Sequence, residues 1–205
     1  MKITSPLGKI IQHREALLGA IIILMLIGIG STAPFFVSPP NLAGVFDDTS
    51  ILIMLACAQM LVILTRCIDL SVASNLAFTG MCVALFNVAY PDTPALVTLV
   101  MSIGIGVMLG AFNGLLVWFV GIPSIVVTLG TMSVYRGFVF LLSDGEWVNA
   151  HEMTPQFLAF PRATFLDITL LSWIAVVIAI AVYVFARFTK TGRAIYAVGG
   201  NPKAA

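Results

Sequence analysis

Apolar residues in this chain form six long runs that are separated by short polar stretches. The runs cover residues 16–36, 50–64, 70–89, 95–119, 124–142 and 168–188. A helix needs about 20 residues to cross the ~30 Å hydrocarbon core of a bilayer, and most of these runs approach that length. The pattern therefore predicts an all-α fold, a polytopic membrane helix bundle with about six transmembrane helices in a single transmembrane domain over residues 1–205.

Composition supports a membrane location and excludes several classes of protein. Hydrophobic residues make up 60% of the chain and charged residues 9%, whereas a soluble domain has about 25% charged residues. Outside the short cytoplasmic ends proposed below there is no basic cluster, so a nucleic-acid partner is not predicted. The three cysteines lie in or beside apolar runs without C-x-x-C spacing, and the two histidines lie far apart. No metal site is predicted.

The distribution of Lys and Arg gives the orientation, because positive residues are retained on the cytoplasmic side of a membrane. With the amino terminus inside, Arg162 lies outside and Arg136 lies within a span. The other eight of the ten basic residues are then cytoplasmic: Lys2, Lys9, Arg14, Arg66, Arg187, Lys190, Arg193 and Lys203. Both termini are therefore predicted to be cytoplasmic. The outer connections are residues 38–49, 90–94 and 143–167, and the aromatic content of the longest suggests a structured cap or an interfacial segment.

The polar stretch TRCIDLSVASNLAFTG, residues 65–80, lies between the second and third runs. Two interpretations fit it. In the first, Arg66 and Asp69 pair at i,i+3 or end successive helices, and Asp69 or Ser71 caps the third span. In the second, the stretch is a broken helix whose hydroxyls and amides line a pathway, because irregular backbone at membrane depth must face protein or water.

Polar side chains on otherwise apolar spans are candidates for a solute pathway or for bonds between helices. At ~1.5 Å per residue, Arg136 lies about 18 Å along the helix from Ser124, past the membrane midplane. A cation at that depth must face protein or water or extend its side chain outward. The glycine row Gly106, Gly110 and Gly114 predicts close packing against a neighbouring helix. The pathway candidates are Gln59, Ser74, Asn75, Asn113, Thr128, Thr131 and Arg136.

Several chemistries are missing from the spans. No span has Asp, Glu or His near its middle, which argues against a proton relay or a carboxylate ion site. The chain has no nucleophile elbow, zinc-binding helix or phosphate-binding loop, so it is predicted to be no enzyme and to bind no cofactor itself. An uncharged polar interior favours a neutral, hydroxylated solute, with energy supplied by another subunit.

Three stretches resemble the simple-sugar branch of bacterial ABC-importer permeases, the ribose, xylose and rhamnose type. They are TRCIDLSVAS at residues 65–74, IPSIVVTLGTMSVYRG at 122–137 and TGRAIYAVGGNPKAA at 191–205. The family usually has glycine where Arg66, Cys67 and Ala73 stand here. With GEWVNAHEM at 145–153, that variation is most similar to rhamnose permeases and next to the related permeases for quorum-signal sugars.

The resemblance implies a site and a set of partners. It implies a second permease subunit in a homo- or heterodimer, a cytoplasmic ATPase subunit that binds the ATP, a periplasmic sugar-binding protein, and a location in the bacterial inner membrane. Family members continue past residue 205, so the resemblance also implies a C-terminally truncated chain. The residues that match the family fall in three groups. The first is Asp69, Leu70 and Ser71 of a signature turn, which also contains the variant Arg66. The second is Thr128, Gly130, Thr131 and Arg136, and the third is the start of a cytoplasmic coupling region over residues 189–205 that includes Gly199, Gly200, Asn201, Ala204 and Ala205.

The predicted function is therefore a permease subunit that imports a neutral monosaccharide, with rhamnose as the best candidate, by alternating access. Two alternatives remain at this stage. One is a stand-alone channel or facilitator for small polar solutes, and the other is a membrane scaffold that transports nothing.

Overall fold

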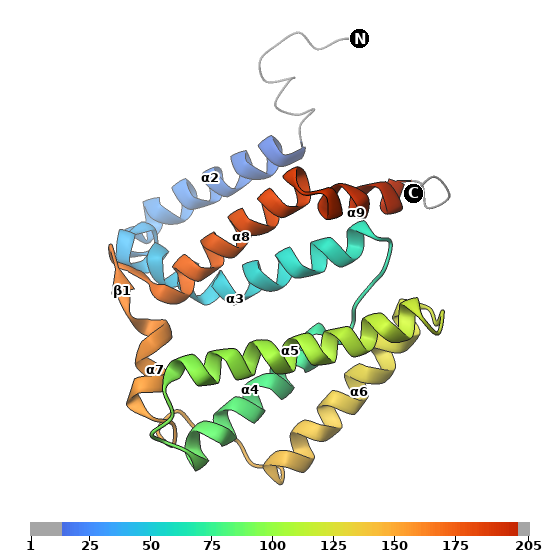
Figure 1. Cartoon of the computed structure of the whole chain (residues 1–205). Coiled ribbons are helices and arrows are strands. Elements are labelled where there is room, and N and C mark those ends of the chain that lie inside the picture. Colours follow the sequence, from blue (N-terminus) through green and yellow to red (C-terminus); the bar gives the residue numbers. More distant parts are fainter. Residues whose placement is uncertain (1–13, 201–205) are drawn as a thin grey trace, which may run out of the picture. The chain divides into compact units, whose positions relative to one another are not determined.

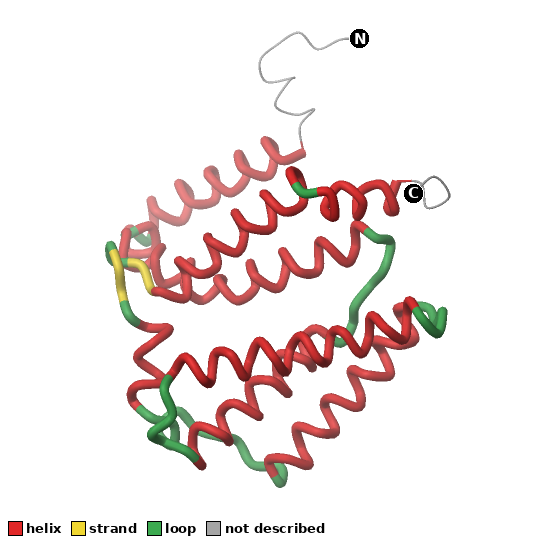
Figure 2. The backbone as a smooth tube through the Cα atoms, in the orientation of Figure 1, coloured by secondary structure: helices red, strands yellow, loops and turns green. Residues whose placement is uncertain are grey.

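A computed structural model describes residues 14–200, with side chains from residue 16 onward (Figures 1 and 2). The chain divides into two compact units, Met1–Asp48 and Thr49–Ala205, which are described separately. The elements are α2 (Arg14–Thr32), η1 (Pro34–Val37), α3 (Pro39–Leu64), α4 (Val72–Ala89), α5 (Ala95–Trp118), α6 (Ser124–Ser143), α7 (Pro155–Arg162), β1 (Thr164–Phe165), β2 (Ile168–Thr169), α8 (Leu170–Phe188) and α9 (Lys190–Gly200).

Five helices are long and apolar enough to cross a membrane: α3, α4, α5, α6 and α8. The chain is thus an all-α, multi-pass membrane protein, as predicted. The apolar part of α2, residues 16–32, is shorter than each of these five helices, so a sixth span at residues 16–36 stays a prediction.

The first unit corrects one predicted boundary. Residues 38–49 were expected to form an outer loop, yet α3 begins at Pro39 and is helical from there. A proline at the start of a helix loses nothing by lacking an N–H, because the first N–H groups of a helix have no partner within it. The amide of Asn41 also donates to the carbonyl of Phe36 at 2.8 Å, which joins the start of α3 to η1.

In the second unit, α4 packs against both α5 and α6 (Figure 1). The ring of Phe78 on α4 stacks on Tyr135 of α6 with centroids 6.4 Å apart. Val83, Val127 and Tyr135 are buried in this three-helix group. Helices α3 and α8 run beside each other, and the hydroxyl of Ser50 donates to that of Ser172 at 3.0 Å between them.

The segment between α6 and α8, here called the outer segment, contains regular structure, as expected from the sequence. It contains α7 and an antiparallel hairpin of β1 and β2. Leu166 and Asp167 form the turn of this hairpin with φ of 54° and 59°, the left-handed conformation that such two-residue turns require. Asn87 of α4 ties the cap to the bundle, because its Oδ1 accepts from the backbone N–H of Thr154 at 2.9 Å.

A sharp turn joins α8 to α9. The Thr189 hydroxyl accepts from the N–H of Gly192 at 3.0 Å and so begins α9. A Cβ at Gly192 would lie 2.7 Å from the Cα of Ala186, closer than real Cβ contacts. The turn therefore depends on a residue without a side chain.

Candidate functional site

Residues 65–71 interrupt the helices and begin the site. Helix α3 ends at Leu64, and Arg66 adopts a left-handed conformation with φ of 63°. Asp69 Oδ1 accepts from the backbone N–H of Ser71 at 2.8 Å and from its hydroxyl at 2.7 Å. Ser71 is fully buried at the start of α4. Asp69 thus fixes the first turn of α4 without capping it directly.

The two sequence interpretations of this stretch are both modified. A break over residues 65–80 was considered, but α4 is continuous from Val72, so the irregular backbone is confined to residues 65–71. Arg66 and Asp69 were considered as a pair. Instead, the Arg66 side chain binds α9 and the Asp69 side chain binds Ser71.

A buried chain of hydrogen bonds connects this turn to α5 and α6. Asn113 of α5, 5% exposed, donates from Nδ2 to the Ser71 hydroxyl at 2.8 Å. Tyr135 of α6 donates to the carbonyl of Leu109 at 3.1 Å and, more weakly, to Asn113 Oδ1 at 3.5 Å. Asp69, Ser71, Asn113 and Tyr135, here called the polar cluster, therefore join three segments in the second unit.

The first turn of α6 holds the interrupted segment in place. The Thr128 hydroxyl accepts from the N–H of Leu70 at 3.1 Å, and the Ser124 hydroxyl accepts from the N–H of Ile68 at 3.2 Å. These two hydroxyls thus supply hydrogen-bond partners to two backbone N–H groups that lie outside the helices. Thr128 is itself buried and is a structural partner of the turn.

The remaining pathway candidates are dispersed. Thr131 is buried and donates to the Val127 carbonyl of its own helix at 3.1 Å. Asn75 of α4 donates to the carbonyl of Gly106 on α5 at 3.4 Å. Ser74 is buried, and among the described residues its hydroxyl has no hydrogen-bond partner. Gln59 is half-buried on α3, outside the polar cluster.

The glycine row on α5 does not act as predicted within the described chain. A Cβ at Gly106 would approach Asn75 Oδ1 at 3.9 Å, but a Cβ at Gly110 or Gly114 would meet nothing within 4 Å. Both of the latter glycines are exposed. Spacing alone predicted a shared face, but it did not show that a neighbouring helix covers that face.

Arg136 lies beside a cavity and apart from the polar cluster. The cavity has a volume of about 600 Å³ and lies between α4 and α6, with Trp147 of the outer segment on its wall. The Arg136 side chain is exposed and lines this cavity. The other walls are Leu76, Ala77, Gly80, Met81, Ala84, Val139, Phe140 and Val148.

Arg66 connects the signature turn to α9, although the sequence placed them in separate groups. Its Nε donates to the carbonyl of Gly199 at 2.6 Å and an Nη donates to that of Gly200 at 2.9 Å. The last carbonyls of a helix have no partner within it and carry partial negative charge, so a cation stabilises them. The carbonyl of Leu64, at the end of α3, presses on Gly199 so closely that a Cβ there would overlap it. Arg66 thus places a positive charge where the C-termini of α3 and α9 meet. The other predicted residues of the coupling region, Asn201, Ala204 and Ala205, lie outside the described residues.

Some buried polar residues were not singled out from the sequence. Asn87, Thr98, Ser50 and Ser172 are almost completely buried. Asn87 could have been recognised from the sequence, because it is an amide inside an apolar span, as Asn113 is. Ser50 and Ser172 had none, because their pairing depends on how α3 and α8 meet.

Two further properties describe the chemistry of the described residues. They contain no group of three or more His, Cys, Asp or Glu side chains that could hold a metal ion. In the outer segment, the backbone and side-chain amides of Asn149 donate to Glu152 and lower the pKa of its carboxyl group.

Comparison with known proteins gives consistent matches along the chain. Residues 41–205 match the family described as "Branched-chain amino acid transport system / permease component". The chain is 35% identical over 195 residues to the autoinducer 2 import system permease protein LsrC of Salmonella typhi, covering 94% of this chain and 55% of that protein. It is 34% identical to the protein of the same name from Photorhabdus laumondii, covering 94% of this chain and 57% of that protein.

The chain therefore spans about half the length of the curated relatives it matches. No solved structure matches it. Together with the five spans, these matches make it a multi-pass protein of the inner membrane whose relatives are transport components.

Proposed function

Because the chain belongs to the family of permease components of branched-chain amino acid transport systems, we propose that it is a permease subunit of an ATP-driven importer that works by alternating access. A cytoplasmic ATPase subunit binds and hydrolyses ATP, and the chain itself carries no cofactor. A second permease subunit, identical or different, completes the pathway. A periplasmic binding protein delivers the solute.

The polar side chains of α4, α5 and α6 are the observation that supports the solute class. Helices α4, α5 and α6 present hydroxyl and amide groups, and Arg136 is their only charged residue. An amino acid carries both an ammonium and a carboxylate group, and burying these needs opposite charges. A neutral hydroxylated solute needs only hydrogen-bond partners, so we propose a monosaccharide-like substrate, with rhamnose as the first candidate.

The proposed pathway has two parts. On the outer side, Arg136 and Trp147 line the 600 Å³ cavity, where a guanidinium group donates to solute hydroxyls and an aromatic ring packs on a sugar face. Further in, the buried hydroxyl of Ser74 has no partner among the described residues. The Nδ2 of Asn75 makes a long 3.4 Å bond to α5, while its Oδ1 accepts from the Thr79 hydroxyl at 3.2 Å. Both groups have hydrogen-bonding capacity to offer when the bundle opens.

Uptake into vesicles tests this proposal. The complete subunit and its partners would be reconstituted, and ATP-dependent uptake of labelled rhamnose, autoinducer 2 and leucine compared. We expect uptake of rhamnose or autoinducer 2 only when the subunit is present. Uptake of leucine alone would overturn the solute class, and unchanged uptake without the subunit would overturn the function.

Variants separate the pathway from general packing. Asn75→Ala should raise the KM for solute several-fold while membrane insertion stays normal. Ser133→Ala is the matched control, because Ser133 is exposed on α6 and bonds only to the Leu129 carbonyl of its own helix. Solute flux through liposomes that contain this polypeptide alone would favour a channel. Assembly defects without any change in KM would favour a scaffold.

A further inference from the structure

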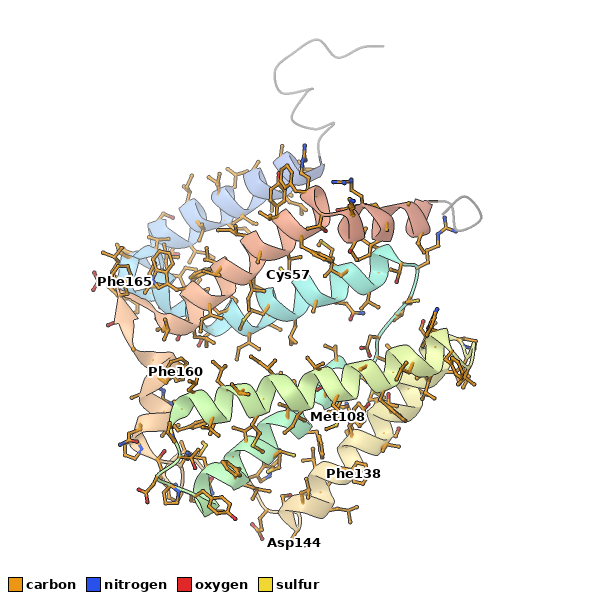
Figure 3. The ribbon with its side chains drawn as sticks, viewed as in Figure 1. Cys57, Met108, Phe138, Asp144, Phe160 and Phe165 are labelled. Atoms are coloured by element: carbon orange, nitrogen blue, oxygen red, sulfur yellow. The ribbon has the colours of Figure 1, made fainter. Side chains whose placement is uncertain are left out.

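A second cavity lies away from the polar cluster, between α3, α8 and α9. Its volume is about 510 Å³, within the usual size range of ligand pockets. Cys57 and Met60 of α3 form one wall, and Ala179 and Val182 of α8 form another. Figure 3 shows Cys57 between these two helices. This part of the cavity is apolar and is lined by two helices that are long and apolar enough to cross a membrane.

The other end of the cavity is basic and lies at the cytoplasmic side given by the Lys and Arg distribution. Arg187 comes from the last turn of α8 and Arg193 from the start of α9. Tyr183 and Tyr196 stand beside them and are 56% and 50% exposed. No Asp or Glu lines the cavity among the described residues, so the two positive charges are not neutralised by its walls.

The two guanidinium groups retain hydrogen-bonding capacity. Arg193 donates one N–H to the Phe188 carbonyl at 3.0 Å, but a guanidinium has five donors. Arg187 is exposed at the end of α8. Paired planar donors of this kind match the oxygens of a phosphoryl group.

We propose that this cavity binds an anionic phospholipid of the cytoplasmic leaflet. The phosphoryl group contacts Arg187 and Arg193, the tyrosines lie at headgroup level, and an acyl chain lies along the apolar wall. Basic pockets between membrane helices on the cytoplasmic side suit anionic headgroups, and each basic residue contributes about fivefold to such binding. A free phosphate ion would use the basic end but gain nothing from the wall beside Cys57.

The native cysteines provide the test. The purified protein in detergent is treated with N-ethylmaleimide, and the labelling of Cys57 and Cys82 is measured by mass spectrometry while lipid is added. Cys82, half-buried on α4 away from the cavity, is the internal reference. We expect phosphatidylglycerol to protect Cys57 selectively, phosphatidylcholine to protect it at least tenfold less well, and inorganic phosphate to have no effect.

Charge variants complete the test. The double variant Arg187→Gln with Arg193→Gln should raise the phosphatidylglycerol concentration needed for half-protection about 30-fold. Arg162→Gln on the outer helix α7 is the control and should leave it unchanged. Equal protection by both lipids, protection by inorganic phosphate, or full protection in the double variant would each overturn the proposal. Normal labelling of Cys82 in the double variant shows that the variant is folded.

Discussion

Replacing Asp69 by alanine is expected to destabilise the turn between α3 and α4. The carboxylate accepts two bonds from Ser71, at 2.8 Å and 2.7 Å, and Ser71 is fully buried. A hydrogen bond to a charged group contributes about 1.5–3 kcal/mol. Because Asp69 is half-buried, the lower figure applies to each bond. The expected loss is therefore about 3 kcal/mol in the free energy of unfolding.

Two control variants make the measurement specific. Asp69→Asn keeps an acceptor oxygen and removes the charge, so it should cost about 1 kcal/mol. Asp92→Ala removes an exposed carboxylate between α4 and α5 and should change stability by less than about 0.5 kcal/mol. Unfolding by sodium dodecyl sulfate in mixed micelles gives all three values. Solute uptake by the reconstituted importer should fall with Asp69→Ala, while the amount of inserted protein stays normal.

The result that would refute this reasoning is a small effect of Asp69→Ala. A loss no larger than that of Asp92→Ala would mean that the two bonds do not determine the start of α4. Equal losses for Asp69→Ala and Asp69→Asn would mean that charge, rather than an acceptor oxygen, stabilises the turn.

Three other changes test separate parts of the structure. Gly199→Ala should displace α9 from the Leu64 carbonyl and cost about 2 kcal/mol, whereas Gly200→Ala, where a Cβ meets nothing within 4 Å, should be harmless; equal unfolding curves would contradict this. Asn87→Leu should free the outer segment at Thr154, seen as faster amide exchange over residues 150–162, and unchanged exchange there would count against the anchor. The lowered pKa of Glu152 means that its contribution is present above the ordinary glutamate pKa and is lost as pH falls through the lower folded value. Amide protection near Asn149 should therefore fall on acidification, and a Glu152→Gln variant that kept the same pH dependence would refute the link.

The spans were predictable because the bilayer imposes a local requirement. Lipid offers no partner to a backbone N–H, so a segment as apolar as α5 must satisfy its own bonds as a helix. The polar stretch after Leu64 likewise marked an interruption correctly. The expected loop at residues 38–49 was wrong because prolines begin a helix as readily as they end one. Among the described residues no neighbouring helix covers Gly110 and Gly114; spacing defines a helix face but not its neighbour.

The polar cluster shows where sequence reasoning stopped. Asn113 and Thr128 were recognised as polar groups in apolar spans, but their partners were not. Asn113 reaches Ser71, 42 residues away in sequence, and Thr128 reaches Leu70, 58 residues away. The same limit applies to Arg66, whose partner Gly199 lies 133 residues along the chain.

By itself, the sequence determined that this is an all-α membrane protein, where most of its helices lie and where a polar stretch follows α3. Each of these depends on the balance of apolar and polar residues within about 20 positions, which is the length of helix that spans the hydrocarbon core of a bilayer. Only the tertiary structure decided that Arg66 joins α9 to the end of α3, that Asp69 holds Ser71, and that Arg187 and Arg193 share a cavity with Cys57. Those contacts depend on how helices are brought together, and residues with the same local pattern have different partners in different packings.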